Sequence, residues 1–195
     1  MSTITIGTHN EFSSFNNVFI RQNFGVYEFP SIDAFLNGDN ADEFYRSYSL
    51  VDDVTGDESA AAATFNTLQV GIYVQDEWTP SDKLTVTAGV RLDVPFILDD
   101  PNIHSSFNTT TLPAISAAYD VEGTRGGETP EGQLMVSPRI GLQYAASEKT
   151  NIRGGLGIFT SRIPFVWPGA MFNNNGLSIG HSGSAFRSRP SKATN

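Results

Sequence analysis

Histidines and acidic stretches are the residues of this chain whose types could bind a metal ion or move a proton. His9, His104 and His181 are far apart in the sequence, so a shared site would depend on the fold to assemble them. The acidic stretches Val51–Glu58 and Leu98–Asn102 offer oxygen ligands for a cation such as calcium. Neither has the D-x-[DN]-x-[DN]-G spacing, so solvated loops and solvated histidines are the simpler interpretation.

A glycine-rich run, Arg153–Phe159 (RGGLGIF), raises the question of a phosphate-binding loop. It lacks the third glycine of G-x-G-x-x-G, and no helical pattern follows it. Glycine here is better explained by a strand that curves or packs closely against a neighbour. The chain contains no cysteine, which excludes disulfides, thiolate catalysis and cysteine-bound metal. No nucleophile, base and acid stand out together, so we expect neither an enzyme nor a cofactor.

Polar side chains at odd-numbered positions form a more informative set. In Leu68–Trp78 and Leu84–Val94 the apolar residues keep to even numbers, with Asp76 as an exception, and the polar residues keep to odd numbers. A period of two predicts strands with one apolar and one polar face. The same alternation returns in Val136–Tyr144 and Ile152–Ile158. The candidate functional residues on the polar face are Gln69, Gln75, Arg91, Asp93, Arg139 and Arg153.

The connections between these strands alternate in length. Thr79–Lys83 and Ala146–Lys149 are short and polar, as in hairpin turns. The others are long and cover about residues 21–65, 95–134 and 161 to the end, which is unusual inside a compact soluble domain. Hairpin partners must present the same face to the same surroundings, and this requirement explains why the apolar parity continues through the short turns.

The first long connection is expected to carry local structure of its own. Ser31 suits a helix N-cap, IDAFLN follows it, and Gly38 suits the end of the helix. Phe44–Leu50 has the composition of a further strand. No second domain is expected from the pattern.

Two architectures fit an alternation of this kind. A soluble sheet covers its apolar face with a core, whereas a transmembrane barrel turns that face to lipid and its polar face to the lumen. The eleven residues of Leu68–Trp78 span about 36 Å and, tilted by about 45°, cross an apolar band of about 25 Å. Trp78 and Tyr144 stand beside the short turns on the apolar face, where an interfacial aromatic girdle belongs.

The predicted fold class is therefore all-β. We expect an antiparallel transmembrane β-barrel segment of about five long spanning strands, with short periplasmic turns and long extracellular loops. Because the smallest barrels need about eight strands, the barrel is expected to be incomplete. A soluble antiparallel β-sheet module for binding or adhesion remains the alternative.

Bulk composition sets limits on the function. The chain has 195 residues and 39% hydrophobic residues, enough for one domain with a sizeable core. Its net charge of -9 argues against a nucleic-acid partner, which would need clustered lysine and arginine. No apolar run approaches the length of about 18 residues that a transmembrane helix requires. The first residues lack the basic and apolar regions of a secretory signal peptide.

Seven motifs, spread over most of the chain, resemble the barrel of TonB-dependent receptors. The pair VQDEW and GVRLD, separated by a short turn, is similar to TonB-dependent barrels in general, and the last two motifs are similar to the Oar-like group. The motifs are GTHNEF (Gly7–Phe12), FIRQNFG (Phe19–Gly25), FLNG (Phe35–Gly38), VQDEW (Val74–Trp78), GVRLD (Gly89–Asp93), SPRIG (Ser137–Gly141) and RGGLGIFTSRIPFVW (Arg153–Trp167).

This resemblance implies an outer-membrane receptor of Gram-negative, Bacteroidetes-type bacteria, with about 22 strands around an N-terminal plug. Its partners would be outer-membrane lipid, the TonB complex that acts through the plug, and an imported substrate. The chain departs from the pattern, since residues 1–195 contain no signal peptide, TonB box or plug. Its end, Ser188–Asn195, is not an amphipathic strand with a terminal aromatic residue. We therefore expect a partial receptor barrel, with a non-functional truncated reading frame as a further alternative.

Overall fold

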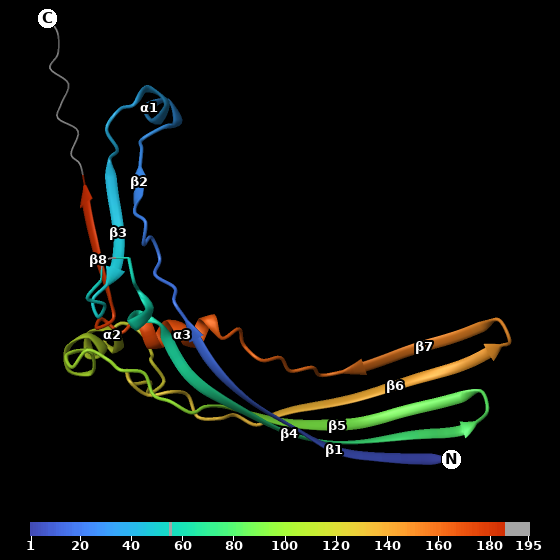
Figure 1. Ribbon diagram of the computed structural model, residues 1–195. Helices are drawn as coiled ribbons and strands as arrows, with labels where there is room; N and C mark the ends of the chain where they lie inside the picture. Colours follow the sequence, from blue (N-terminus) through green and yellow to red (C-terminus); the bar gives the residue numbers. More distant parts are fainter. Residues whose placement is uncertain (55, 186–195) are drawn as a thin grey trace, which may run out of the picture. The chain divides into compact units, whose positions relative to one another are not determined.

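The computed structural model describes residues 1–54 and 56–185, and the expectation for Ser188–Asn195 lies outside them (Figure 1). The chain forms two compact units. The first, called the sheet unit, contains residues 1–15, 65–100 and 129–165. The second, called the loop unit, contains residues 16–64, 101–128 and 166 onward.

Long antiparallel strands make up the sheet unit. They form one curved five-stranded sheet in the order β1-β4-β5-β6-β7, which confirms the expected number of strands (Figure 1). The backbone groups of Met1 and Thr79 bond to each other at 2.9 and 2.8 Å, so the N-terminal strand also runs antiparallel to its neighbour. The strands are β1 (Ser2–Asn17), β4 (Ala63–Ser81), β5 (Leu84–Ile97), β6 (Met135–Ser147) and β7 (Thr150–Gly157).

Tight turns join β4 to β5 and β6 to β7. Ser81 pairs with Leu84, and Ser147 pairs with Thr150, so each turn is shorter than its sequence suggested. The pairing register shifts just before each turn, between Trp78 and Ser81 in one hairpin. The strands are correspondingly longer than expected: β4 has 19 residues, or about 60 Å of extended chain. All three long connections leave the sheet at the end opposite these turns.

The register places even-numbered residues opposite even-numbered residues across four strands. Val74 lies opposite Val90, which lies opposite Pro138, and Ile140 lies opposite Leu156. Because successive side chains of a strand alternate between faces, this register collects the apolar residues on one face of the sheet. The predicted shared parity is confirmed.

Aromatic packing forms the core of the sheet unit at the end away from the turns. Phe65 is only 1% exposed. Its ring centroid lies 4.8 Å from that of Phe15 and 6.1 Å from that of Phe165. Phe15 in β1 and Phe65 in β4 have odd numbers and therefore lie on the polar face of the sheet. Phe165 comes from the segment after β7. Aromatic contacts at such distances add to the stabilisation that burial itself provides.

A second, smaller sheet belongs to the loop unit. Its strands pair antiparallel in the order β2 (Val26–Glu28), β3 (Glu43–Ser49) and β8 (Ile179–Ala185). The strand expected over Phe44–Leu50 is confirmed as β3. Strand β8 was not predicted, because its run IGHSGSA has no apolar alternation to indicate a strand.

Short helices complete the loop unit. The predicted helix is confirmed as α1 (Ile32–Asn37): the Ser31 hydroxyl accepts a hydrogen bond from the Ala34 N–H at 3.1 Å, and Gly38 ends it with φ 73°. Among the described residues, no helix is long and apolar enough to cross a membrane. The other helical segments are η1 (Ser59–Ala61), η2 (Phe107–Thr111), α2 (Leu112–Ser116) and α3 (Val166–Asn173).

Candidate functional site

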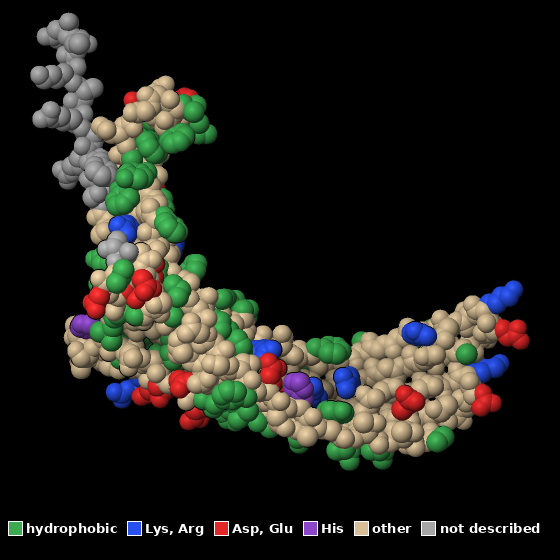
Figure 2. Space-filling model, in the orientation of Figure 1, with side chains coloured by type: hydrophobic (Ala, Val, Ile, Leu, Met, Phe, Trp, Pro, Cys, Tyr) green, Lys and Arg blue, Asp and Glu red, His purple; other side chains and the backbone are tan. Residues whose placement is uncertain are grey.

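The two faces of the five-stranded sheet have opposite character. On the even face, Ile72 and Ile140 are each 54% exposed and Leu156 is 80% exposed. On the odd face, the polar residues Asp93 and Ser137 are 2% and 8% exposed. In Figure 2, hydrophobic side chains project from the lower, convex side of the sheet. A water-soluble sheet shows the reverse distribution, with its apolar face covered.

Asp93 is the centre of the most buried polar cluster on the odd face. Arg91 donates to both carboxylate oxygens, from Nε to Oδ2 and from Nη2 to Oδ1, each at 2.7 Å. Gln69 donates from Nε2 to Oδ1 at 3.1 Å. The sheet register explains the meeting, because Gln69 faces Pro95 and lies diagonal to Asp93 on the neighbouring strand. Three of the six predicted polar-face residues are thus brought together.

Gly71 makes room for this cluster. This role of the glycine was not predicted from the sequence. Gly71 lies directly opposite Asp93 in the ladder. A Cβ at this position would stand 2.6 Å from the Asp93 Oδ1 atom and 3.1 Å from the Arg91 Nη2 atom. A glycine that interrupts the odd-numbered polar series was the available signal, since glycine inside a strand often marks a close approach of other groups.

Arg139 and Gln75 form a second, more exposed pair on the same face. The Arg139 Nη2 group donates to the Gln75 Oε1 atom at 3.3 Å. Next to Arg139, a hollow of about 200 Å³ extends over the Asp93 cluster toward Ser137 and Thr160, whose hydroxyls lie 2.9 Å apart. The hollow is small, its polar side chains already have hydrogen-bond partners, and Ile158 and Phe159 complete its lining.

Arg153 lies apart from these clusters. It sits on β7 opposite Gln143, which in turn lies opposite Thr85. Thr85 is eight residues from Asp93 along β5. Arg153 is exposed. The six predicted residues therefore do not form one site: three meet at Asp93, two form a pair, and one stands near the turns.

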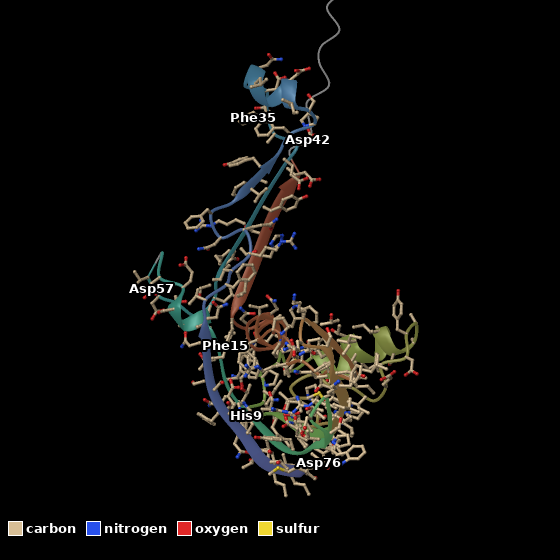
Figure 3. The ribbon with its side chains drawn as sticks, turned by 90° about the vertical axis from the view of Figure 1, so that its right-hand side faces the viewer. His9, Phe15, Phe35, Asp42, Asp57 and Asp76 are labelled. Carbon is tan, nitrogen blue, oxygen red and sulfur yellow. The ribbon has the colours of Figure 1, made fainter. Side chains whose placement is uncertain are left out.

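Glu11 and Arg162 contribute an ion pair that sequence reasoning missed. The Arg162 Nη1 group donates to the Glu11 Oε1 atom, and its guanidinium lies 5.1 Å from the centre of the Phe165 ring. His9 lies beside them, with its Nε2 atom 3.7 Å from Glu11 Oε2. Figure 3 shows His9 and Phe15 along β1. Partners separated by 151 positions leave no local signal in the sequence.

Trp78 and Tyr144, the predicted interface aromatics, lie near the turn ends of β4 and β6. Trp78 pairs with Val86, and Tyr144 pairs with Leu84, close to the two tight turns. Both side chains are exposed on the even face. Asp76, the exception to the apolar pattern, accepts a hydrogen bond from the Ser2 hydroxyl at 2.6 Å (Figure 3). This bond partly satisfies a carboxylate on an otherwise apolar face.

The acidic stretch between β3 and η1 uses its carboxylates to hold its own backbone. Asp52 accepts hydrogen bonds from the Ser49 hydroxyl at 2.5 Å and from the Ala60 N–H at 2.9 Å. Hydrogen bonds from the side chain and backbone of Ser59 lower the pKa of Asp57 below its ordinary value. Within residues 1–54 and 56–185, no group of three or more histidine or acidic side chains is arranged to hold a metal ion.

Comparison with known proteins agrees with a sheet whose apolar face is exposed. The model of one protein family, described as an outer membrane beta barrel domain, matches residues 2–194. No curated protein and no solved structure gives a significant match. The matched family places the chain in the outer membrane and favours a barrel wall over the soluble binding module. With its five-stranded antiparallel sheet, open at β1 and β7, the chain is an incomplete β-barrel and belongs to the outer membrane beta barrel domain family.

Proposed function

We propose that this chain forms part of the wall and outer loops of a TonB-dependent receptor that imports nutrients across the outer membrane. The observation that carries the proposal is the distribution of side chains on the sheet: large apolar residues are exposed on the even face, whereas the polar residues Asp93 and Ser137 are buried on the odd face. Lipid on one side makes this arrangement favourable, because exposed apolar area in water is costly. The even face then contacts lipid, and the odd face borders the lumen.

Strand length supports a membrane-spanning wall. The 14 residues of β5 extend about 46 Å and, tilted by about 45°, rise about 33 Å. That rise covers an apolar band of about 25 Å with several ångströms to spare at each end. Trp78 and Tyr144 then lie near the periplasmic interface, beside the short turns, and the long connections lie on the extracellular side.

The finer assignment, to the Oar-like group of TonB-dependent receptors, rests on the seven motifs. In the structure, VQDEW lies in β4 just before its turn, and GVRLD lies in β5. The first two residues of GVRLD pair with the first two of VQDEW, and the other three pair with the residues before VQDEW. SPRIG occupies the first half of β6, and the glycine run that follows it in β7 pairs with it. A receptor of this kind in a Bacteroidetes-type bacterium would draw energy through its plug and the TonB complex.

Tryptophan quenching tests the lipid-facing assignment. The variant Trp167→Phe leaves Trp78 as the one tryptophan, since the chain has two. In vesicles of brominated lipid, we expect strong quenching of Trp78 fluorescence compared with vesicles of ordinary lipid. Fluorescence equal in both vesicles, from protein that remains soluble without detergent, would instead support the soluble binding module.

The DNA on both sides of this reading frame tests the receptor assignment. We expect the frame to continue upstream into a signal peptide, a TonB box and a plug, and downstream into further alternating strands. The complete receptor should then support growth on its substrate only while the inner-membrane energy source is intact. A frame closed at both ends, or uptake that persists without that energy source, would contradict the proposal.

A further inference from the structure

A pocket of about 870 Å³ lies in the loop unit. Its walls come from two segments distant in sequence, residues 101–128 and 171–176. The His104 N–H donates to the Asn175 carbonyl at 3.2 Å and joins the two segments. Asn108 exchanges two hydrogen bonds with the Gly126 backbone, both 2.9 Å long, and fixes the first segment on itself. A pocket of this volume is in the range of small-molecule sites.

Half-buried apolar side chains form one part of the pocket lining, called the floor here. Ile103, Phe107, Leu112, Val121 and Met171 line it, and all five side chains are half-buried. Gly126 lets the loop lie against the floor, because a Cβ there would stand 2.0 Å from Ile103 Cδ1 and 2.5 Å from Phe107 Cδ1. Such a surface accepts an apolar body and gains free energy by excluding water from it.

The exposed charged residues of the lining, called the rim here, carry an excess of negative charge. Asp120, Glu122 and Glu128 line it, against one guanidinium, Arg125. Arg125 Nε lies 3.5 Å from Glu128 Oε1, so the carboxylates of Asp120 and Glu122 remain as the excess. The Glu122 N–H donates to Asp120 Oδ1 at 2.9 Å, in a turn where Glu122 has the uncommon φ of 48°. This bond keeps the two acidic residues side by side.

We propose that this pocket binds a small amphipathic molecule with an apolar body and a protonated amine. The apolar body would cover Phe107, Leu112 and Met171, and the ammonium group would lie between the carboxylates of Asp120 and Glu122. Charge complementarity favours a cation over a neutral or anionic analogue of the same shape. The binding inference holds whether or not the chain imports the ligand. The further inference that this ligand is the transported substrate rests on the proposed function.

Calorimetric titration of the full chain, folded in a nonionic detergent, tests this inference. The probe is the dipeptide amide Phe-Leu-NH2, which has one protonated amine, and its N-acetylated form serves as the neutral match. Titration into empty micelles corrects for partition into detergent. We expect saturable binding with a dissociation constant of tens to hundreds of micromolar, as for ligands of about 20 non-hydrogen atoms. The acetylated probe should bind at least about fivefold more weakly.

Charge-neutralising variants locate the binding. Glu122→Gln should weaken binding of the amine probe roughly two- to fivefold, as expected for one partly exposed ion pair. Glu131→Gln removes the same charge from an exposed position outside the pocket and should leave binding unchanged. Equal binding of both probes, an equal effect of both variants, or no saturable heat would each overturn the proposal.

Separate measurements keep this inference and the proposed function distinguishable. If the amine probe binds as expected but uptake by the complete receptor needs no TonB energy, the pocket stands and the receptor assignment fails. If uptake is energised but the probe does not bind, the receptor assignment stands and the pocket inference fails.

Discussion

The two faces of the five-stranded sheet obey different physical rules although they share every backbone hydrogen bond. On the even face, isoleucine, leucine and valine stay exposed and make few contacts with the rest of the chain. On the odd face, arginine, aspartate and glutamine bond to one another, and phenylalanines pack together. It follows that the odd face depends on specific side chains that contact one another, whereas the even face needs only to be apolar.

Removing a buried ring from the odd face should have the largest effect. Phe65→Ala deletes a side chain that is 1% exposed and contacts two other rings, so we expect a loss of about 3–5 kcal/mol in the free energy of unfolding. Phe12→Ala, on the exposed even side of β1, should lower the free energy of unfolding by about 1–2 kcal/mol. This variant loses the transfer of the Phe12 ring out of water but leaves no cavity behind. Urea unfolding of both variants in detergent makes the comparison, and equal losses would break it.

A charge placed on the even face should be the next most costly change. Ile140→Arg puts a cation in the middle of the apolar surface, between Ala88 and Leu156, at a cost of about 2–4 kcal/mol in lipid. Thr87→Arg is the matched control on the odd face, where Glu77 lies directly opposite. Insertion into lipid vesicles, followed by protease protection, should fail for the first variant and proceed for the second. Equal insertion would contradict the assignment of the faces.

Gly157→Arg, also at an odd-numbered position, would be a poorer control than Thr87→Arg. A Cβ at Gly157 would stand 3.1 Å from the Pro138 carbonyl oxygen and from the Arg139 Cβ atom. A failure of that variant would mix crowding with charge, whereas Thr87 already carries a β-branched side chain.

The Asp93 cluster should contribute an intermediate amount. Asp93→Ala leaves Arg91 without its two hydrogen-bonded oxygens, and we expect a loss of about 1–3 kcal/mol, reduced because the Arg91 side chain is 32% exposed. Adding Arg91→Ala should cost less than the sum of the two single changes. Urea unfolding of the four proteins gives this double-mutant cycle. Strict additivity would show that the two side chains are not coupled.

The exposed pair on the odd face should matter least. Arg139→Gln weakens one hydrogen bond of 3.3 Å between the exposed Arg139 and the half-buried Gln75, so the free energy of unfolding should change by less than about 1 kcal/mol. The same unfolding experiment measures it. A loss as large as that of Asp93→Ala would show that exposure does not rank the contacts of this face.

Much of the sheet could be predicted from residues near one another in the sequence. The alternation in Leu68–Trp78 and Leu84–Val94 predicts the strands, and the short break between them predicts the hairpin and the register of its faces. The cap residues Ser31 and Gly38 likewise predict α1. Strand β8 could not be predicted, because its pairing with β3 joins positions 130 to 142 residues apart and its composition is not typical of a strand.

The candidate sites divide in the same way. Odd parity alone was enough to select Gln69, Arg91 and Asp93 as polar-face residues, but not to show that these three meet while Arg153 stands apart. The loop-unit pocket left no signal, since its walls combine residues 101–128 with residues 171–176.

The local sequence was enough to predict the apolar face of the four alternating strands β4 to β7, the positions of the tight turns, and the common end of the sheet from which the long connections leave. These properties follow from the two-residue repeat of an extended backbone, which is local. Only the tertiary structure decided which face is covered and which polar groups find partners, such as Arg162 with Glu11. Such contacts depend on the order of strands in the sheet and on residues far apart in the chain, which no local pattern encodes.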